Sequence, residues 1–372
     1  MPHTDTVDEA ARIMGICNAC RYCEGFCPVF PAMERRFHFA EADLTYLANL
    51  CHQCQACYYA CQYAPPHEFA VNVPATFAEL RRRSWSDHAW PRTLAPLLAR
   101  NGLWVSLATA ASVALALIAT ALWVDADILF AAHEGPGAFY AVIPHELMVA
   151  LFGGVFLYVV LAVWLAALGF TRHIGAGAPG PVERGDWMAA ISAAATLRHL
   201  GGGGDGCTYP GERPANARRV FHHLTAYGFL LCFAATCAGT VYHYLFALEA
   251  PYSFASAPVV LGSLGGIGLV VGPAGLLWLR HRADPDPADP GARGMDLAFL
   301  VLLLLTSLTG LALLVLRTTP AMGLLLAIHL AIVLALFLTL PYGRFVHAVH
   351  RLLALVHDAR EARLMKPPAI SG

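Results

Sequence analysis

Eight of the eleven cysteines fall in two short runs near the start of the chain. The first run, CNACRYCEGFCP, begins at Cys17, and the second, CHQCQACYYAC, begins at Cys51. Both have the spacing C-x2-C-x2-C-x3-C, which is typical of proteins that bind two [4Fe–4S] clusters through cysteine thiolates. Clusters of this kind pass single electrons over a distance. The sequence therefore predicts a domain that conducts electrons.

The fourth cysteine of such a run usually binds the other cluster of the pair. We therefore expect cluster one to be held by Cys17, Cys20, Cys23 and Cys61. We expect cluster two to be held by Cys51, Cys54, Cys57 and Cys27. Structural zinc usually takes separated pairs of ligands, and disulfides are rare in the cytoplasm, so both alternatives fit this pattern poorly.

The residues between the two runs include AMERRFHFAEADLTYLANL. Their apolar side chains follow a helical rather than an alternating period. This favours an α-helical two-cluster module, of the kind found in succinate-dehydrogenase-type iron–sulfur subunits, over a small β-rich ferredoxin.

The rest of the chain has the composition of a membrane protein. Hydrophobic residues make up 58% and charged residues 13%, against roughly 45–50% and about 25% in soluble domains. Six apolar stretches follow residue 100, each near the ~20 residues that cross a bilayer as a helix. These expected spans lie near Leu103–Val124, Glu146–Phe170, Phe221–Leu248, Val259–Leu279, Met295–Leu316 and Met322–Tyr342.

The predicted fold class is therefore all-α, with an N-terminal α-helical two-[4Fe–4S] ferredoxin-like domain and a six-helix transmembrane bundle. We place the iron–sulfur domain at 1–100, the cytochrome b-like membrane domain at 101–343, and a C-terminal helix and tail at 344–372. The net charge of −1 gives no general attraction to nucleic acid.

Arginines predict the orientation in the membrane. They gather before the first expected span, between spans two and three, between four and five, and after the sixth. The alternate loops Asp125–His145 and Glu249–Pro258 contain no Lys or Arg. The N-terminal stretch also lacks the apolar core of a secretory signal. By the positive-inside rule, both termini and the cysteines lie in the cytoplasm, which suggests the inner membrane of a bacterium.

Histidines within or beside the spans suggest haem, because ionisable residues there are by default functional. With ~100° per residue, His329 and His347 share one helix face, and His222 and His243 lie ~60° apart. The topology then predicts two bis-histidine b haems, one on His222 and His347 and the other on His243 and His329, with His223 and His350 as substitutes. His145 and His173 are expected at the membrane interfaces. An interfacial histidine bonded to backbone is the alternative for each of these residues.

Other features carry less chemistry. Gly201–Gly204 is not a phosphate-binding loop, because no strand precedes it and no GK[ST] follows it. Cys207 follows this loop, and a contact with a partner or a cluster stays open for it. The chain has no dinucleotide fingerprint and no nucleophile beside a base, so we expect no catalytic residues. It should act as an electron-transfer subunit rather than as a stand-alone enzyme.

The last apolar stretch resembles a known haem-binding segment. The segment IHLAIVLALFLTLPYGRFVHAVHR resembles the last span of the dihaem cytochrome b subunits of respiratory nitrate reductases (gamma subunit) and heterodisulfide reductases. This resemblance implies that His329 and His347 are haem ligands. The third span departs from the nitrate-reductase arrangement, which has a closer histidine pair.

The whole chain resembles the tricarballylate-utilisation protein B (TcuB/CitB-type) family. The motifs that carry this resemblance are the two cysteine runs and two further segments, LRHLGGGGDGCTYP and RRVFHHLTAYGFLLCFAAT. This resemblance implies a cytoplasmic FAD-dependent dehydrogenase as partner, which oxidises tricarballylate to cis-aconitate. The chain would then reoxidise the flavin and pass electrons to membrane quinone through two [4Fe–4S] clusters and one or two b haems.

Two alternatives stay open. A transporter or sensor for tricarboxylates could use the clusters as a redox switch, but the spans show no inverted repeat and no central arginine for an anion. The membrane domain could also lack haem, and the clusters would then reduce quinone directly.

Overall fold

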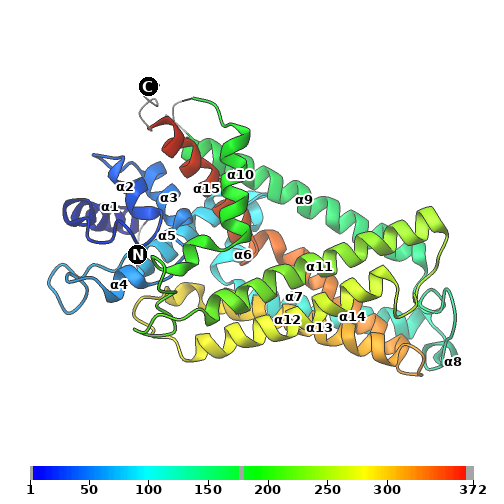
Figure 1. Cartoon of the computed structure of the whole chain (residues 1–372). Helices are drawn as coiled ribbons and strands as arrows, with labels where there is room; N and C mark the ends of the chain where they lie inside the picture. The colour runs from blue at the N-terminus through cyan, green and yellow to red at the C-terminus, as the bar shows by residue number, and fades with distance from the viewer. Residues whose placement is uncertain (1–2, 176–179, 366–372) are drawn as a thin grey trace.

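The computed structural model describes residues 3–175 and 180–365. These residues form helices and no strand, with one isolated bridge between Cys207 and Ala215. Short helices of the N-terminal part gather at one end of the molecule, and long helices run away from them (Figure 1). The predicted all-α class is confirmed. Residues 366–372 of the expected C-terminal tail lie outside the described residues.

The N-terminal domain is a cluster of helices around one apolar core. Its helices are α1 (His3–Cys20), α2 (Val29–Glu34), α3 (Glu41–Leu50), α4 (Ala56–Tyr59) and α5 (Val73–His88). Phe30, Tyr46 and Phe77 are fully buried between them. Asn72 caps α5 by accepting a hydrogen bond from the Ala75 amide. The cysteines lie at the ends of α1 and α3 and in the turns that follow, so the helix ends position them.

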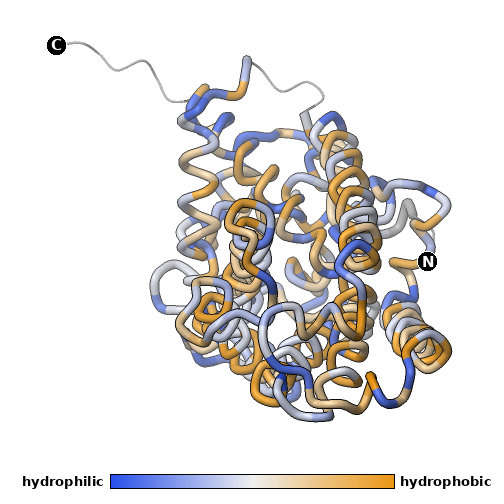
Figure 2. Tube along the Cα trace, turned by 90° about the vertical axis from the view of Figure 1, so that its right-hand side faces the viewer, coloured by the Kyte–Doolittle hydropathy of each residue, from blue (hydrophilic) through white to orange (hydrophobic). Residues whose placement is uncertain are grey.

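The membrane part contains six helices that are long and apolar enough to cross a bilayer. They are α7 (Asn101–Trp123), α9 (His145–Gly175), α11 (Ala217–Phe246), α12 (Ala257–His281), α13 (Arg293–Leu316) and α14 (Met322–Thr339). Figure 2 shows these long helices coloured mostly as hydrophobic. Large apolar side chains such as Leu122, Leu157 and Val315 are exposed on them, as expected for surfaces that face lipid. The chain is a multi-pass membrane protein.

Short helices connect these elements. They are η1 (Arg92–Leu94), α6 (Pro96–Ala99), α8 (Ala126–Leu129), α10 (Arg184–Ala195), η2 (Arg198–Gly201), η3 (Pro290–Ala292) and η4 (Leu340–Tyr342). The last helix is α15 (Val346–Leu364).

Glycines fix the position of α11 against α12. A Cβ on Gly228 would lie 2.9 Å from the Gly265 carbonyl oxygen, and one on Gly272 would lie 2.7 Å from the Thr225 amide nitrogen. Small residues at such contacts let the two backbones approach closely within a membrane. This packing holds α11, which carries His222 and His243, in a defined place.

Helix α15 leaves the bundle and enters the N-terminal domain, where it packs beside α10 (Figure 1). Arg35 forms an ion pair with Asp358 at 2.8 Å, and Arg36 forms one with Glu361 at 2.6 Å. On the other side, Arg363 pairs with Asp186 of α10 at 3.0 Å. The end of the chain therefore ties the membrane bundle to the cysteine domain.

Candidate electron-transfer site

The cysteines predicted for cluster one line one cavity of about 270 Å³. The other residues that line this cavity are Ile16, Tyr22, Phe30, Cys57, Ala60, Gln62, Tyr63, Val71 and Val73. Burial raises the pKa of Cys17 to about 12, and the thiols of Cys23, Cys61 and Cys20 add to this rise. Cys61 therefore lies among the first three cysteines of the other run, as the spacing predicts for a two-cluster protein.

The cysteines predicted for cluster two are also neighbours. Burial first, and then the Cys54, Cys27, Cys51 and Cys23 thiols, raise the pKa of Cys57 well above its ordinary value. Burial and then the Cys54, Cys51 and Cys23 thiols raise the pKa of Cys27, against a smaller opposing effect of the Val29 backbone. Thiols that are neutral at pH 7 release protons when metal binds them. The structure thus brings cysteines of the two runs together, with Cys61 near the first run and Cys27 near the second.

Single metal ions and iron–sulfur clusters require different distances between their ligands. Within residues 3–175 and 180–365, no three His, Cys, Asp or Glu side chains lie close enough to hold one metal ion. In a [4Fe–4S] cluster each thiolate binds a different iron, so its ligands stand farther apart. Gln53 and Gln55, with φ of 57° and 66°, adopt the left-handed region on both sides of Cys54. Strained backbone of this kind persists where the surrounding structure requires it.

A loop from the membrane domain, Leu197–Pro210, packs over Cys54 of the second run; we call it the cover loop. Cys207 is fully buried in it and donates its thiol hydrogen to the Cys54 carbonyl at 3.2 Å. The Thr208 amide donates to the same carbonyl at 2.9 Å. Leu200 packs against Cys54 and Ala56. The sequence left the role of Cys207 and of the glycines open, and the structure places them over the second cysteine run.

We expect Gly202→Ala to open the cover loop. Gly202 has φ of +52°, and a Cβ there would lie 2.1 Å from the Gly206 carbonyl oxygen, so the loop must move. Strain of ~1–3 kcal/mol corresponds to a rise of roughly 5- to 150-fold in the opened population. Loss of iron–sulfur absorbance in air should accelerate by a similar factor. Gly211→Ala, where no atom lies within 4 Å of the added Cβ, is the matched control. Equal rates for both variants would contradict this role of the loop.

The predicted pair His222 and His347 meets at the end of the bundle that adjoins the N-terminal domain. Their ring centroids lie 6.1 Å apart, with His222 on α11 and His347 on α15. A metal bound at ~2 Å by one nitrogen of each imidazole separates two ring centroids by about this distance. The Nδ1 of His347 lies 2.5 Å from the Arg344 carbonyl, which leaves its Nε2 for a metal. The buried Nδ1 of His222 has no hydrogen-bond partner. The separation of these two imidazoles is therefore that of two ligands of one metal.

The other predicted pair is arranged differently. Across the described residues, no ring contact joins His243 to His329. His243 stacks on His145 of α9 with centroids 3.8 Å apart. The Nδ1 of His329 lies 3.0 Å from the Thr309 hydroxyl.

The two substitutes point away from the His222–His347 pair. The Nε2 of His223 lies 3.3 Å from the Ala195 carbonyl. The ring of His350 lies 4.4 Å from that of Phe170 and 6.2 Å from that of His88. His222 and His347 are therefore the two that the structure brings together.

Arginines link the histidine pair to the second cysteine run. Arg218 donates to the Gln53 carbonyl, and Arg351 donates to the Cys51 carbonyl at 2.8 Å. Arg218 is one helical turn before His222, and Arg351 is one turn after His347, so each histidine lies ~6 Å along its helix from an arginine that holds this run. The predicted cluster two and the predicted haem are therefore neighbours.

Sequence reasoning did not find these arginines. The signal was present, because R-x3-H and H-x3-R place each arginine on the same helix face as its histidine. A third arginine, Arg81 of α5, donates to the Cys51 carbonyl at 2.8 Å. Burial lowers the pKa of Arg81 to about 10, which leaves the guanidinium charged at neutral pH.

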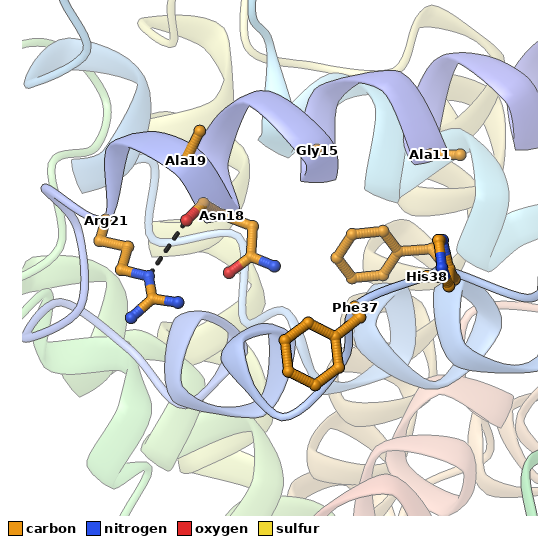
Figure 3. Close-up of a pocket in the computed structure, with 8 residues that line it drawn as sticks. Ala11, Gly15, Asn18, Ala19, Arg21, Phe37 and His38 are labelled. Carbon is orange, nitrogen blue, oxygen red and sulfur yellow. Dashed lines mark hydrogen bonds between the residues drawn. The ribbon is translucent and has the colours of Figure 1, made fainter.

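A shallow surface pocket of about 460 Å³ lies on α1, the helix that also carries Cys17 and Cys20. Its lining residues are Ala11, Gly15, Asn18, Ala19, Arg21, Phe37, His38 and Phe39. Figure 3 shows Phe37 and His38 opposite α1, with the Arg21 side chain donating to the Asn18 carbonyl. The Phe37 side chain is 96% exposed, which is unusual for so large an apolar group outside the membrane.

Comparison with known proteins gives consistent matches along the chain. The family model described as "Citrate utilization protein B Fer4-like domain" matches residues 10–87, and the one described as "Citrate utilization protein B" matches residues 96–368. A curated Escherichia coli protein named "Citrate utilization protein B" is 48% identical over 370 residues, covering 99% of this chain and 96% of that protein. No solved structure matches the chain.

Proposed function

Because the chain belongs to the citrate utilization protein B family, we propose that it carries electrons from a reduced flavoprotein dehydrogenase to membrane quinone. The observation that carries this proposal is the contact between its parts. Cysteines of the two runs lie near one another, and Arg218 and Arg351 join the second run to the pair His222 and His347. A Fer4-like domain and six apolar helices give the framework that such a carrier needs.

We assign cluster one to Cys17, Cys20, Cys23 and Cys61, and cluster two to Cys51, Cys54, Cys57 and Cys27. When bound, these clusters and a b haem supply the one-electron chemistry that no side chain of the chain has. The residues of the chain hold the groups in order. Cluster one would lie nearest the α1 surface, and cluster two beneath the cover loop, where Cys51 and Cys54 are buried.

We propose His222 and His347 as the ligands of one b haem at the cytoplasmic side. His243 and His329 are proposed for a second haem at the opposite side, where Thr309 orients the His329 ring. The arginine-rich loops support an orientation with both termini in the cytoplasm and a location in the cytoplasmic membrane of a bacterium.

The flavoprotein is proposed to dock over the pocket on α1. Phe37 and the exposed Tyr22 would supply apolar contact area there, and Cys20 lies at the end of the same helix. The name of the E. coli relative refers to citrate, and the family resemblance implies tricarballylate. Both are tricarboxylates, so the partner would be an FAD-dependent dehydrogenase of a tricarboxylate, and the substrate would bind to that partner.

Liposomes that contain the purified protein and a quinone analogue test this proposal. Dithionite added outside supplies electrons, and the ultraviolet spectrum reports the quinol. We expect quinol formation that depends on the protein and is lost in a Cys54→Ala variant. Liposomes without protein set the background rate. Reduced clusters without quinol formation would contradict the proposal, and uptake of labelled tricarballylate would support the transporter instead.

A further inference from the structure

Three arginines surround the short segment from Cys51 to Gln53. Arg81 and Arg351, from α5 and α15, both donate to the Cys51 carbonyl at 2.8 Å. Arg81 also donates to the Gln53 side chain at 2.8 Å, and Arg218 of α11 donates to the Gln53 carbonyl. Helices that are far apart in the sequence thus direct three positive charges to one segment.

These charges lack an ion-pair partner among the described residues, and Asp296, the carboxylate that acts on Arg81, is already paired with Arg280 and Arg344. In the part of the chain that the structure describes, no Asp or Glu forms an ion pair with Arg81, Arg218 or Arg351. Arg81 is 1% exposed, and its Nε, like that of Arg351, is buried without a hydrogen-bond partner. Burying a cation without a counter-charge costs several kcal/mol, so this arrangement indicates an anion at the segment.

Cluster one lacks such surroundings. Arg21, the arginine beside its first three cysteines, is exposed and donates to the Asn18 carbonyl. The side chains that line the cavity of cluster one include no arginine among the described residues. The two cysteine groups, although similar in sequence, therefore lie in different electric fields.

We propose that Arg81, Arg218 and Arg351 hold the reduction potential of cluster two above that of cluster one. This inference rests on the proposed function, because it assumes that both cysteine groups bind [4Fe–4S] clusters. Reduction adds one electron to a group that is already negative and changes no bond. Positive charges nearby, in a site with little water, stabilise the added electron. Electrons from the flavoprotein would then pass from cluster one to cluster two, toward His222 and His347.

The test is a potentiometric titration of the purified full chain, followed by electron paramagnetic resonance. We expect Arg351→Gln to lower the reduction potential of cluster two by at least ~59 mV. This corresponds to a tenfold shift of its one-electron equilibrium toward the oxidised form. Cluster one should keep its potential. Arg351→Lys keeps the positive charge, so cluster two should keep most of its wild-type reduction potential in this variant. Arg282→Gln removes an exposed arginine that lies over the Trp278 ring and not on the segment, and it is the control. Arg218→Gln, on another helix, repeats the test.

The wild-type protein gives an independent result that needs no arginine variant. The cluster that is reduced first should be the one that disappears in Cys54→Ala and remains in Cys20→Ala. An unchanged potential in Arg351→Gln and Arg218→Gln, or first reduction of the cluster that Cys20→Ala removes, would overturn the inference and leave the proposed function intact. Fewer than two clusters in the wild-type protein would instead overturn the proposed function.

Discussion

Cys61→Ala is expected to remove cluster one, although Cys61 belongs to the second cysteine run. In the structure Cys61 lies with Cys17, Cys20 and Cys23 around one cavity. The remaining three thiols cannot complete four ligands. Changes in the outer shell of a metal site cost ~10–100-fold, so loss of a ligand should lower quinone reduction more than ~100-fold. Iron content should fall by about half, and one of two paramagnetic signals should disappear.

Matched cysteine variants identify which cluster each residue holds. Cys61→Ala should match Cys20→Ala in the signal that it loses, and Cys27→Ala should match Cys54→Ala. Cys207→Ala is the control, because Cys207 contacts the Cys54 carbonyl but belongs to neither proposed ligand group. If Cys61→Ala instead loses the same signal as Cys54→Ala, each run holds its own cluster. The proposal that Cys61 and Cys27 each bind the cluster of the other run would then be wrong.

His347→Ala is expected to abolish binding of the proposed cytoplasmic haem and to lower quinone reduction more than ~100-fold. The His347 and His222 rings lie 6.1 Å apart, so removal of either leaves one axial ligand. The absorbance bands of b haem in the purified variant should decrease, while the iron–sulfur signals stay. Thermal unfolding in detergent should confirm that the fold is kept.

His223→Ala is the matched control, because His223 is adjacent to His222 and its ring lies near the Ala195 carbonyl. It should keep its haem and its activity. Loss of haem in His223→Ala but not in His222→Ala would reverse the assignment. Retention of all haem in both His222→Ala and His347→Ala would remove this pair from the site.

Much of the site was predictable because cysteine spacing carries geometric information. Three cysteines separated by two residues each can bind three corners of one cluster, and the cross-assignment of Cys61 and Cys27 follows from the general pattern. In the structure Cys61 lies near Cys17 and Cys27 lies near Cys57, and the assignment of each cysteine to a cluster stays a prediction. The six apolar helices were predictable for a similar reason, because only bilayer thickness sets their length.

Contacts between distant segments were not predictable from the sequence. The helical period places His243 and His329 on defined faces of their own helices, but it gives neither the tilt nor the rotation of one helix against another. His243 therefore meets His145, which the sequence assigned to the interface. The convergence of Arg81, Arg218 and Arg351 likewise depends on α15 turning back into the cysteine domain after Pro341 and Gly343.

The central claim is that one chain holds a continuous series of one-electron carriers from its cytoplasmic domain into the membrane. A dithionite-reduced minus oxidised spectrum of the purified protein, with haem, iron and sulfide measured on the same sample, tests it most directly. We predict b-type bands together with about eight cluster irons per chain, the number that two [4Fe–4S] clusters contain. Cluster iron without any b-type bands would contradict the haem assignments, and a chain with neither would contradict the proposed electron transfer altogether.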